Sequence, residues 1–553
     1  MAELKMKILP STEKCFLDDK IEDKPALSEV SMLKNERLSF QLAHTWIDES
    51  NNLRQHYKMT IDSPLENDIT VTKIEPVPVT LPCYPIARDE NYLRTEPGLF
   101  PDLLLPFDYT DLPVVSPNKQ LRAHLFTIEN KDGIEPGEYT ITIRLTVGES
   151  VNTASLKVTV IDAMLPESEL IHTQWFHNDC IATYYRCDVF SERHWELIGN
   201  YMEAAVNCGV NMILTPVMTP PLDTAVGRSR PTVQLIDIDV KDGEYTFGYD
   251  KLDRYVKLAL SKGIRYFEIS HLFSQWGASK APKVMATVDG EYKQLFGWDT
   301  ESTGAEYTKF IREFTSGLVA RLKLLGVDKR CYFHISDEPG LEHLENYTKA
   351  KNLIADIIED YTCMDALSKY EFYETGAVQC PIPATNHIGP FLENKVPDLW
   401  TYYCCGQTVN VSNRFLAMPG QRTRILGYQL FKFDIKGFLQ WGFNFWYSQG
   451  SIHPLDPYTD TCGDYFSPAG DCFSVYPGED GKARYSLHAV HFYEALQDLR
   501  ALKLLESKIG HDAVVALIEE GCDAPMTFAS YPTSQEYLLT LREKINAEIA
   551  KNI

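Results

Sequence analysis

The sequence predicts a multidomain protein in which an N-terminal all-β sandwich precedes a (β/α)8 TIM-like barrel and a C-terminal helical extension. Its 553 residues exceed what one hydrophobic core normally organises. The first 165 or so residues show the two-residue period of strands, whereas strand-like and helix-like runs alternate from about residue 170 to residue 500. We therefore expect a β-sandwich over residues 1–166, the barrel over 170–500, and helices packed on the barrel over 501–553.

The clearest strand of the N-terminal region is Tyr139–Val147, where aliphatic residues alternate with threonine and arginine. This alternation is typical of a strand with one buried face. Leu156–Val160 and Tyr57–Ile61 repeat it, and turn sequences at Lys131–Gly133 and Pro136–Gly137 separate such runs. Several short strands joined by turns favour a sandwich.

After the polar break at residues 166–169, about eight strands alternate with helices, which is typical of a barrel. The expected strands are 171–177, 210–214, 264–272, 331–335, 364–367, 382–385, 399–404 and 437–445. The expected helices are 191–208, 249–262, 305–325, 341–359 and 421–433, with an inserted hairpin at 232–248. A doubly wound sheet is the alternative, but no glycine-rich phosphate turn follows the first strand. The tail from about Leu502 is expected to be helical and amphipathic.

The composition narrows the range of partners. Asp and Glu number 77 and Lys and Arg 53, giving a net charge of −24 that repels nucleic acid and anionic lipid. The first residues do not resemble a signal peptide, and no apolar run of membrane-spanning length occurs. The 13 cysteines lie mostly in apolar runs, which predicts reduced thiols in a cytoplasmic protein. No metal or cofactor motif is present, and the sequence does not predict an oligomeric state.

Two adjacent acids, Asp337 and Glu338, follow the fourth expected strand of the barrel. Barrel enzymes place their active sites at the C-terminal ends of the strands. Two carboxylates held together there repel each other, so that one pKa rises into the range of a general acid. The alternative is that both acids only cap the helix expected from Leu341.

Other strand ends carry residue types that often bind sugars. They are Trp175, His177, Asn178 and Asp179 on the first strand, His271, Gln275 and Trp276 on the third, Trp400, Tyr402 and Tyr403 on the seventh, and Trp441, Asn444 and Trp446 on the eighth. Each residue alone is better explained as part of the core or of an interface. As a set around one end of a barrel, they favour a carbohydrate site.

Several of these runs together resemble glycoside hydrolase family 123. The runs are Phe333–Pro339, His271–Gly277, Ala281–Lys283, Leu295–Trp298 and Gly437–Asn444. The resemblance extends from about residue 170 to 500, and the β-rich N-terminal region fits the layout of the family. It implies a retaining exo-acting β-N-acetylgalactosaminidase that works by substrate-assisted catalysis on a glycan with a terminal β-linked N-acetylgalactosamine.

The resemblance also implies roles for residues. Glu338 would act as general acid and then base, and Asp337 would orient the acetamido group, whose oxygen attacks the anomeric carbon to give an oxazolinium-type intermediate. Tyr402 is expected to donate to that oxygen, and Trp441 to line the acetamido pocket or to stack on the sugar. The remaining expected binding residues are Asn178, Asp179, His271, Trp276, Asn444 and Trp446.

Three alternatives stay open from the sequence. The enzyme could prefer β-N-acetylglucosamine or accept both sugars, which differ only at C4. The chain could be a non-catalytic carbohydrate-binding protein, although the intact acid pair argues against this. A conventional glycosidase could use a separate nucleophile such as Glu268 on the third strand.

Overall fold

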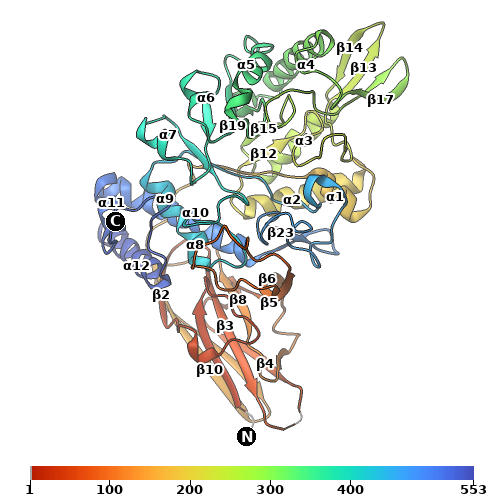
Figure 1. The fold of residues 1–553 in the computed structure, drawn as a ribbon. Coiled ribbons are helices and arrows are strands. Elements are labelled where there is room, and N and C mark those ends of the chain that lie inside the picture. The colour runs from red at the N-terminus through yellow and green to blue at the C-terminus, as the bar shows by residue number, and fades with distance from the viewer. Residues whose placement is uncertain (1–2, 51) are drawn as a thin grey trace.

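The computed structural model describes residues 3–50 and 52–553. Figure 1 shows the strands of the N-terminal region at one end, the barrel at the other, and the C-terminal helices beside both. The predicted fold class is confirmed: N-terminal sheets precede a nearly closed parallel barrel and a set of C-terminal helices.

The N-terminal region consists of two five-stranded sheets with apolar residues between them. One sheet has the order β1 (Glu3–Pro10), β3 (Leu38–Ile47), β8 (Arg122–Ile128), β5 (Ile69–Val79) and β6 (Gly98–Pro106). The other has the order β2 (Glu29–Leu33), β10 (Ser150–Ile161), β9 (Gly137–Val147), β4 (Arg54–Asp62) and β7 (Val114–Pro117). Phe40, Phe126, Ile141 and Ile143 lie in the core between them, and the alternation of Tyr139–Val147 predicted the burial of the two isoleucines.

The barrel is built from eight short parallel strands. In spatial order they are β20 (Cys380–Ile382), β19 (Thr362–Ala366), β18 (Cys331–Phe333), β15 (Tyr266–Ile269), β12 (Met212–Thr215), β11 (Ile171–Gln174), β22 (Gly437–Gln440) and β21 (Trp400–Tyr402). A parallel bridge between Ala384 and Tyr402 brings the first and last of them together, so that the barrel is nearly closed. Their carboxyl ends therefore meet around one mouth.

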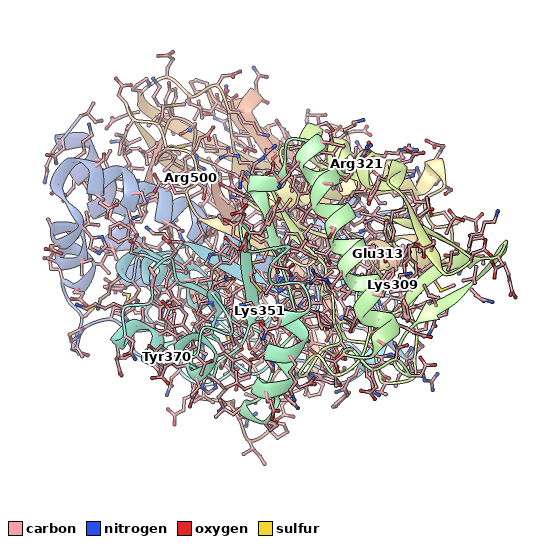
Figure 2. The ribbon with its side chains drawn as sticks, turned by 90° about the horizontal axis from the view of Figure 1, so that it is seen from above. Lys309, Glu313, Arg321, Lys351, Tyr370 and Arg500 are labelled. Atoms are coloured by element: carbon pink, nitrogen blue, oxygen red, sulfur yellow. The ribbon has the colours of Figure 1, made fainter. Side chains whose placement is uncertain are left out.

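Helices cover the outside of the barrel. They are α1 (Asn178–Tyr185), α2 (Glu192–Asn207), α3 (Asp250–Lys262), α4 (Ala305–Leu324), α5 (Leu344–Asn352), α6 (Glu371–Glu374), α7 (Gly389–Glu393), α8 (Gly420–Arg424) and α9 (Leu426–Lys432). Figure 2 shows Lys309, Glu313 and Arg321 along α4. Arg321 pairs with Asp253 of α3, which joins two neighbouring helices of this layer.

Two parts of the chain extend the barrel. An inserted sheet has the order β14 (Glu244–Gly248), β13 (Asp237–Lys241), β16 (Val284–Val288) and β17 (Glu291–Phe296), which includes the predicted hairpin. The C-terminal part contains the hairpin β23 (Val475–Pro477) and β24 (Ala483–Tyr485), and the helices α10 (Leu487–Ile509), α11 (His511–Glu519) and α12 (Gln535–Lys551). No helix among residues 3–50 and 52–553 is long and apolar enough to cross a membrane.

Two helix predictions need correction. The helix expected over 341–359 is shorter, since a 3-10 turn at Leu341–His343 leads into α5 and the chain leaves the helix after Asn352. There the Leu353 carbonyl accepts a hydrogen bond of 2.6 Å from Arg312 of α4. The C-terminal helix begins at Leu487 rather than near Leu502, capped by the Ser486 hydroxyl. Helix α10 therefore runs without a break through the boundary expected at residues 500 and 501.

Buried polar contacts join the N-terminal sheets to the C-terminal helices. Arg542 of α12 donates to Glu36 next to β2 at 2.7 Å and to Asp498 of α10 at 2.6 Å. Asp102 of β6 accepts from the His488 ring at 2.7 Å, and both side chains are inaccessible to solvent. These contacts hold α10, which packs directly on α8 and α9 of the barrel, against the N-terminal sheets.

We predict that Arg542→Leu lowers the free energy of unfolding by about 3 kcal/mol, because two buried carboxylates lose a charged partner. The midpoint of thermal unfolding measures the effect. Lys544→Leu on the same helix is the matched control, since Lys544 pairs with Glu520 at the surface and little change is expected. Equal midpoints for the two variants would contradict the proposed joining role of Arg542.

Candidate active site

The two adjacent acids lie on a turn that is fastened from both neighbouring strands. After β18 the Ser336 hydroxyl donates to the Ser274 carbonyl, which follows β15, at 2.8 Å. The Asp337 carbonyl accepts from the Trp276 amide at 2.8 Å, and the Glu338 amide donates to the Ala366 carbonyl of β19 at 3.0 Å. Beyond the end of β18, individual side-chain and backbone hydrogen bonds therefore connect this turn to β19 and to the loop after β15, in place of regular pairing between strands.

Glu338 has a left-handed backbone, with φ of 42°. Such a conformation costs a residue other than glycine roughly 1–2 kcal/mol, and it persists only where surrounding contacts impose it. It interrupts the alternation by which adjacent strand residues point to opposite faces. The Asp337 side chain is mostly buried and the Glu338 side chain is exposed at the barrel mouth.

The charges of the acids act on each other. Burial is the largest cause of a pKa of Asp337 well above its ordinary value, followed by the negative charges of Glu338 and Asp223. The raised pKa of Asp337 agrees with the expectation that two neighbouring carboxylates raise one pKa.

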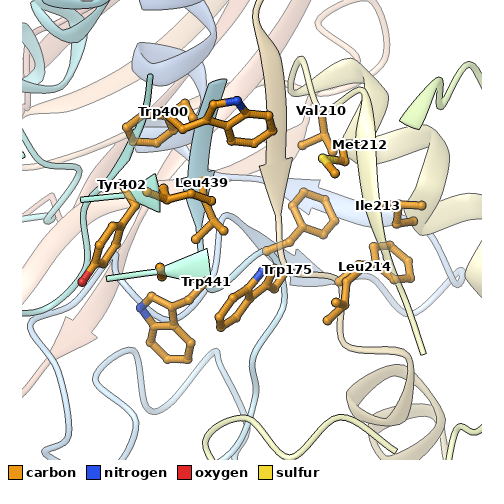
Figure 3. Packing of buried hydrophobic residues seen from close by; sticks show 14 of the residues in the cluster. Trp175, Val210, Met212, Ile213, Leu214, Trp400, Tyr402, Leu439 and Trp441 are labelled. Atoms are coloured by element: carbon orange, nitrogen blue, oxygen red, sulfur yellow. The ribbon is translucent and has the colours of Figure 1, made fainter. Parts of the chain in front are cut away.

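Tyr402 at the end of β21 reaches the acid pair, because its hydroxyl donates to Glu338 Oε1. Burial and the charge of Glu338 raise the pKa of this phenol well above its usual value, so that it remains a donor. Figure 3 shows Tyr402 and Trp441 on neighbouring strands, with Trp175 beside Trp441.

A buried imidazolium lies beneath the acids. The His334 ring donates to Asp365 at 2.8 Å and to Glu268 at 2.6 Å, and all three side chains are inaccessible to solvent. Burial alone would lower the pKa of His334, but the hydrogen bonds and charges of these two carboxylates raise it to about 10. Asp365 also accepts from the amides of Ile335 and Ser336 and from the Tyr347 hydroxyl, so it orients the turn itself.

His271 stacks on His334, with ring centroids 4.1 Å apart. Burial, followed by the charge of His334, keeps the pKa of His271 well below its ordinary value, so this ring is neutral. His271, His334 and Asp365 are close enough together to bind one metal ion. His334, however, could join such a site only by giving up one of its hydrogen bonds to a carboxylate.

Trp441 lies at the end of β22, and its indole nitrogen donates to Asp471 at 3.0 Å. Asp471 is fully buried and also accepts from Ser467 at 2.7 Å. Burial raises the pKa of Asp471 to about 6 despite these donors. The contacts fix the plane of the Trp441 ring at the end of β22, the strand next to the one that carries Tyr402.

Other predicted residues lie in different surroundings. Trp276 is 52% exposed, and its amide contacts the Asp337 carbonyl, so it borders the site. Asp179 pairs with the buried guanidinium of Arg230 at 2.7 Å. The Asn444 amide group exchanges two hydrogen bonds with the His177 backbone, at 2.9 and 3.1 Å. These last two residues have their polar atoms committed within the protein.

Asn178 and Trp446 are also buried away from solvent. Trp446 packs edge-on against Tyr184 of α1 and Tyr201 of α2, which places it in the helix layer. Asn178 begins α1, and its carbonyl accepts a hydrogen bond from His194 of α2. The structure therefore does not bring either residue to the acid pair.

Glu268, the alternative nucleophile, is completely buried on β15. One of its oxygens accepts from Trp175 at 2.7 Å and from His334, and the other accepts from Thr173 at 2.6 Å. With both oxygens engaged below the mouth, Glu268 is not available to attack a sugar. This geometry does not support the conventional-glycosidase alternative.

Sequence reasoning missed Asp223, Asp365 and Asp471. Asp223 lies on an irregular loop, while Asp365 and Asp471 lie within or next to apolar runs where a structural role is expected. The only available signal was that Asp365 is an acid inside a barrel strand, where burial is costly without a partner.

Comparison with protein families identifies this architecture. The model described as the glycoside hydrolase 123 catalytic domain matches residues 175–505. This chain belongs to glycoside hydrolase family 123. The match begins directly after β11, covers the rest of the barrel and most of α10, and includes the turn that carries Asp337 and Glu338.

A solved structure of a family 123 enzyme has the same fold as this chain. A family 123 glycoside hydrolase from Clostridium perfringens, described in a study of glycolipid glycan hydrolysis, is 16% identical, with a TM-score of 0.74 over 99% of this chain and 98% of that one. A β-glucuronidase from Parabacteroides merdae is 10% identical over 90% of this chain and 52% of its own, with a TM-score of 0.31. A search of curated proteins gave no match.

We predict that His334→Gln destabilises this family 123 enzyme by about 3–5 kcal/mol, because Asp365 and Glu268 then share a buried site without a cation. Thermal unfolding measures the loss. His453→Gln serves as control, since His453 contacts Asp464 at the surface and no loss is expected. If His334→Gln unfolded at the wild-type midpoint, the charge of His334 would not be needed to balance Asp365 and Glu268.

Proposed function

We propose that this family 123 enzyme is a retaining exo-β-N-acetylgalactosaminidase that uses the acetamido group of its substrate as the nucleophile. The observation that carries the proposal is that Asp337 and Glu338 are neighbours on one turn at the barrel mouth. A conventional retaining enzyme needs two carboxyl groups about 5–5.5 Å apart on opposite sides of the bond, whereas a substrate-assisted enzyme does not.

In the proposed mechanism Glu338 donates a proton to the glycosidic oxygen as the bond to the anomeric carbon breaks. The acetamido oxygen forms the new bond to that carbon, which gives a bicyclic oxazolinium ion. Ionised Asp337 accepts the hydrogen bond of the acetamido N–H and stabilises its developing positive charge. Glu338 then removes a proton from water, which attacks the anomeric carbon and reopens the ring.

Tyr402 and Trp441 complete the proposed site. The Tyr402 hydroxyl contacts Glu338, and in the proposed complex it donates instead to the acetamido oxygen. Trp441 is fixed by Asp471 and offers an apolar face for the acetamido methyl group or the sugar ring. We propose a glycolipid glycan as the natural substrate, by analogy with the Clostridium perfringens enzyme.

We predict that Glu338→Gln lowers kcat/KM for an aryl β-N-acetylgalactosaminide by about 10²- to 10⁴-fold, because the general acid is lost. Asp337→Asn should lower it by about 10²-fold or more, because the charge that stabilises the acetamido group is lost. Glu342→Gln, four residues beyond Glu338 on the exposed 3-10 turn, is the matched control and should keep full activity.

The same assay with aryl N-acetylglucosaminide, galactoside and glucoside tests the nucleophile. The proposal expects preferred turnover of N-acetylgalactosaminide, almost none of the sugars without an acetamido group, and strong inhibition by a thiazoline mimic of the intermediate. Equal cleavage of the plain galactoside would overturn the mechanism.

The raised pKa of Asp337 gives a prediction on pH. The proposed role requires Asp337 ionised, so activity is lost as pH falls through its pKa. Because burial and the charges of Glu338 and Asp223 raise that pKa well above 3.8, the acid limb of kcat/KM should lie well above the ordinary carboxyl range. Asp223→Asn removes one negative charge and should move this limb to lower pH. A limb that stays in place or moves upward contradicts the prediction.

A further inference from the structure

A third acid, Asp223, lies at the barrel mouth on the loop that follows β12. Its carboxylate is partly exposed and has no hydrogen-bond or ion-pair partner in the part of the chain that the structure describes. Arg230 is nearby on the same loop, but its guanidinium donates to Asp179, His177 and the Leu222 carbonyl. Asp223 is therefore an acceptor held ready for a group outside the protein.

The backbone of Asp223 is fixed in an unusual conformation. Its φ is 49°, a left-handed value that aspartate tolerates better than most residues. Its amide donates to Gln275 Oε1 at 3.1 Å, and its carbonyl accepts from the Ser451 hydroxyl at 2.7 Å. The Gln275 side chain also donates to the Thr224 carbonyl at 3.1 Å. Two separate loops thus hold Asp223 in place.

These contacts connect Asp223 to the acid pair. Gln275 directly precedes Trp276, whose amide donates to the Asp337 carbonyl at 2.8 Å. In the strand order, β12 is three places from β21, which carries Tyr402, and two places from β18, which leads to Asp337. The loop that carries Asp223 therefore leaves the barrel from a strand nearly opposite the one that carries Tyr402.

The electrostatics support the same position. Burial is the main cause of a pKa of Asp223 of about 7, and the charges of Glu338 and Asp471 add to it, while Arg230 opposes it. The negative charge of Asp223 also raises the pKa of Asp337. The carboxylate of Asp223 thus shares the site with both proposed catalytic acids and with the aspartate that holds Trp441.

We propose that Asp223 determines specificity by accepting hydrogen bonds from the C3 and C4 hydroxyl groups of the terminal sugar; this inference rests on the function proposed above. With the acetamido group between Asp337 and Tyr402 and the glycosidic bond at Glu338, these hydroxyl groups point to the opposite wall. Two neighbouring hydroxyl donors match the two oxygens of one carboxylate, which accepts strongly when charged. The C4 hydroxyl is also the group that separates galacto from gluco sugars.

Asp223→Gly tests the proposal, because glycine accepts the left-handed backbone without strain and removes only the carboxylate. Asp223→Asn is the conservative partner. Asp242→Gly is the matched control, since Asp242 is an exposed aspartate with φ of 52° at the tip of the β13–β14 hairpin. Unchanged unfolding midpoints verify that each variant is folded.

The readout is kcat/KM for an aryl β-N-acetylgalactosaminide and for its 3-deoxy and 4-deoxy analogues. For wild type and Asp242→Gly, we expect at least one deoxy analogue to be slower by about 10- to 100-fold, as for a lost hydrogen bond to a charged group. Asp223→Gly should cleave the parent substrate more slowly than wild type by the same factor. The deoxy analogue that is slow with wild type should then be cleaved by Asp223→Gly less than about 3-fold more slowly than the parent substrate.

Two results would overturn the proposal in distinguishable ways. If wild type cleaves the parent but the deoxy penalties remain in full in Asp223→Gly, the two losses are independent and Asp223 does not contact those hydroxyl groups. If wild type cleaves no β-N-acetylhexosaminide at all, the proposed function fails and this inference fails with it.

Discussion

The conformation of the active-site turn depends on one buried carboxylate, Asp365 of β19. It accepts two backbone amides of the turn, the Tyr347 hydroxyl and the protonated ring of His334. A buried anion with so many donors is stabilised only while all of them are present. Because Glu268 binds the other side of His334, the barrel interior below the acids contains two carboxylates around one imidazolium. Glu338, with its left-handed backbone, lies two residues beyond the Ser336 amide that Asp365 binds.

Above this network the enzyme concentrates negative charge. Asp223, Asp337 and Glu338 surround one mouth, and no arginine or lysine pairs with any of their carboxylates among residues 3–50 and 52–553. Burial raises the pKa of Asp337 and of Asp223, and the negative charge of Glu338 raises both further. Such surroundings favour a cationic intermediate, which agrees with the oxazolinium ion of the proposed mechanism.

The sequence predicted the parts of this structure that depend on local patterns. The period-2 alternation of Tyr139–Val147 and the helix signals at Ser191 and Gly263 gave correct elements, and the strand-end rule gave Asp337 and Glu338. It could not predict pairings between distant residues. Asp179 follows the first barrel strand as a sugar-binding residue would, but Arg230, 51 residues later, binds it. Asp223 lacked any signal because its loop has no periodicity and its position depends on Gln275 and Ser451.

The claim at the centre of this account is that the acetamido oxygen of the substrate, rather than a protein carboxylate, attacks the anomeric carbon. The most direct measurement is kcat/KM for aryl N-acetylgalactosaminides whose acetyl group carries zero, one, two or three fluorine atoms. Fluorine withdraws electrons from the carbonyl oxygen, so a steep and progressive fall in rate with each added atom is predicted. Rates that do not depend on fluorination would show that the oxygen does not attack, and would contradict the account.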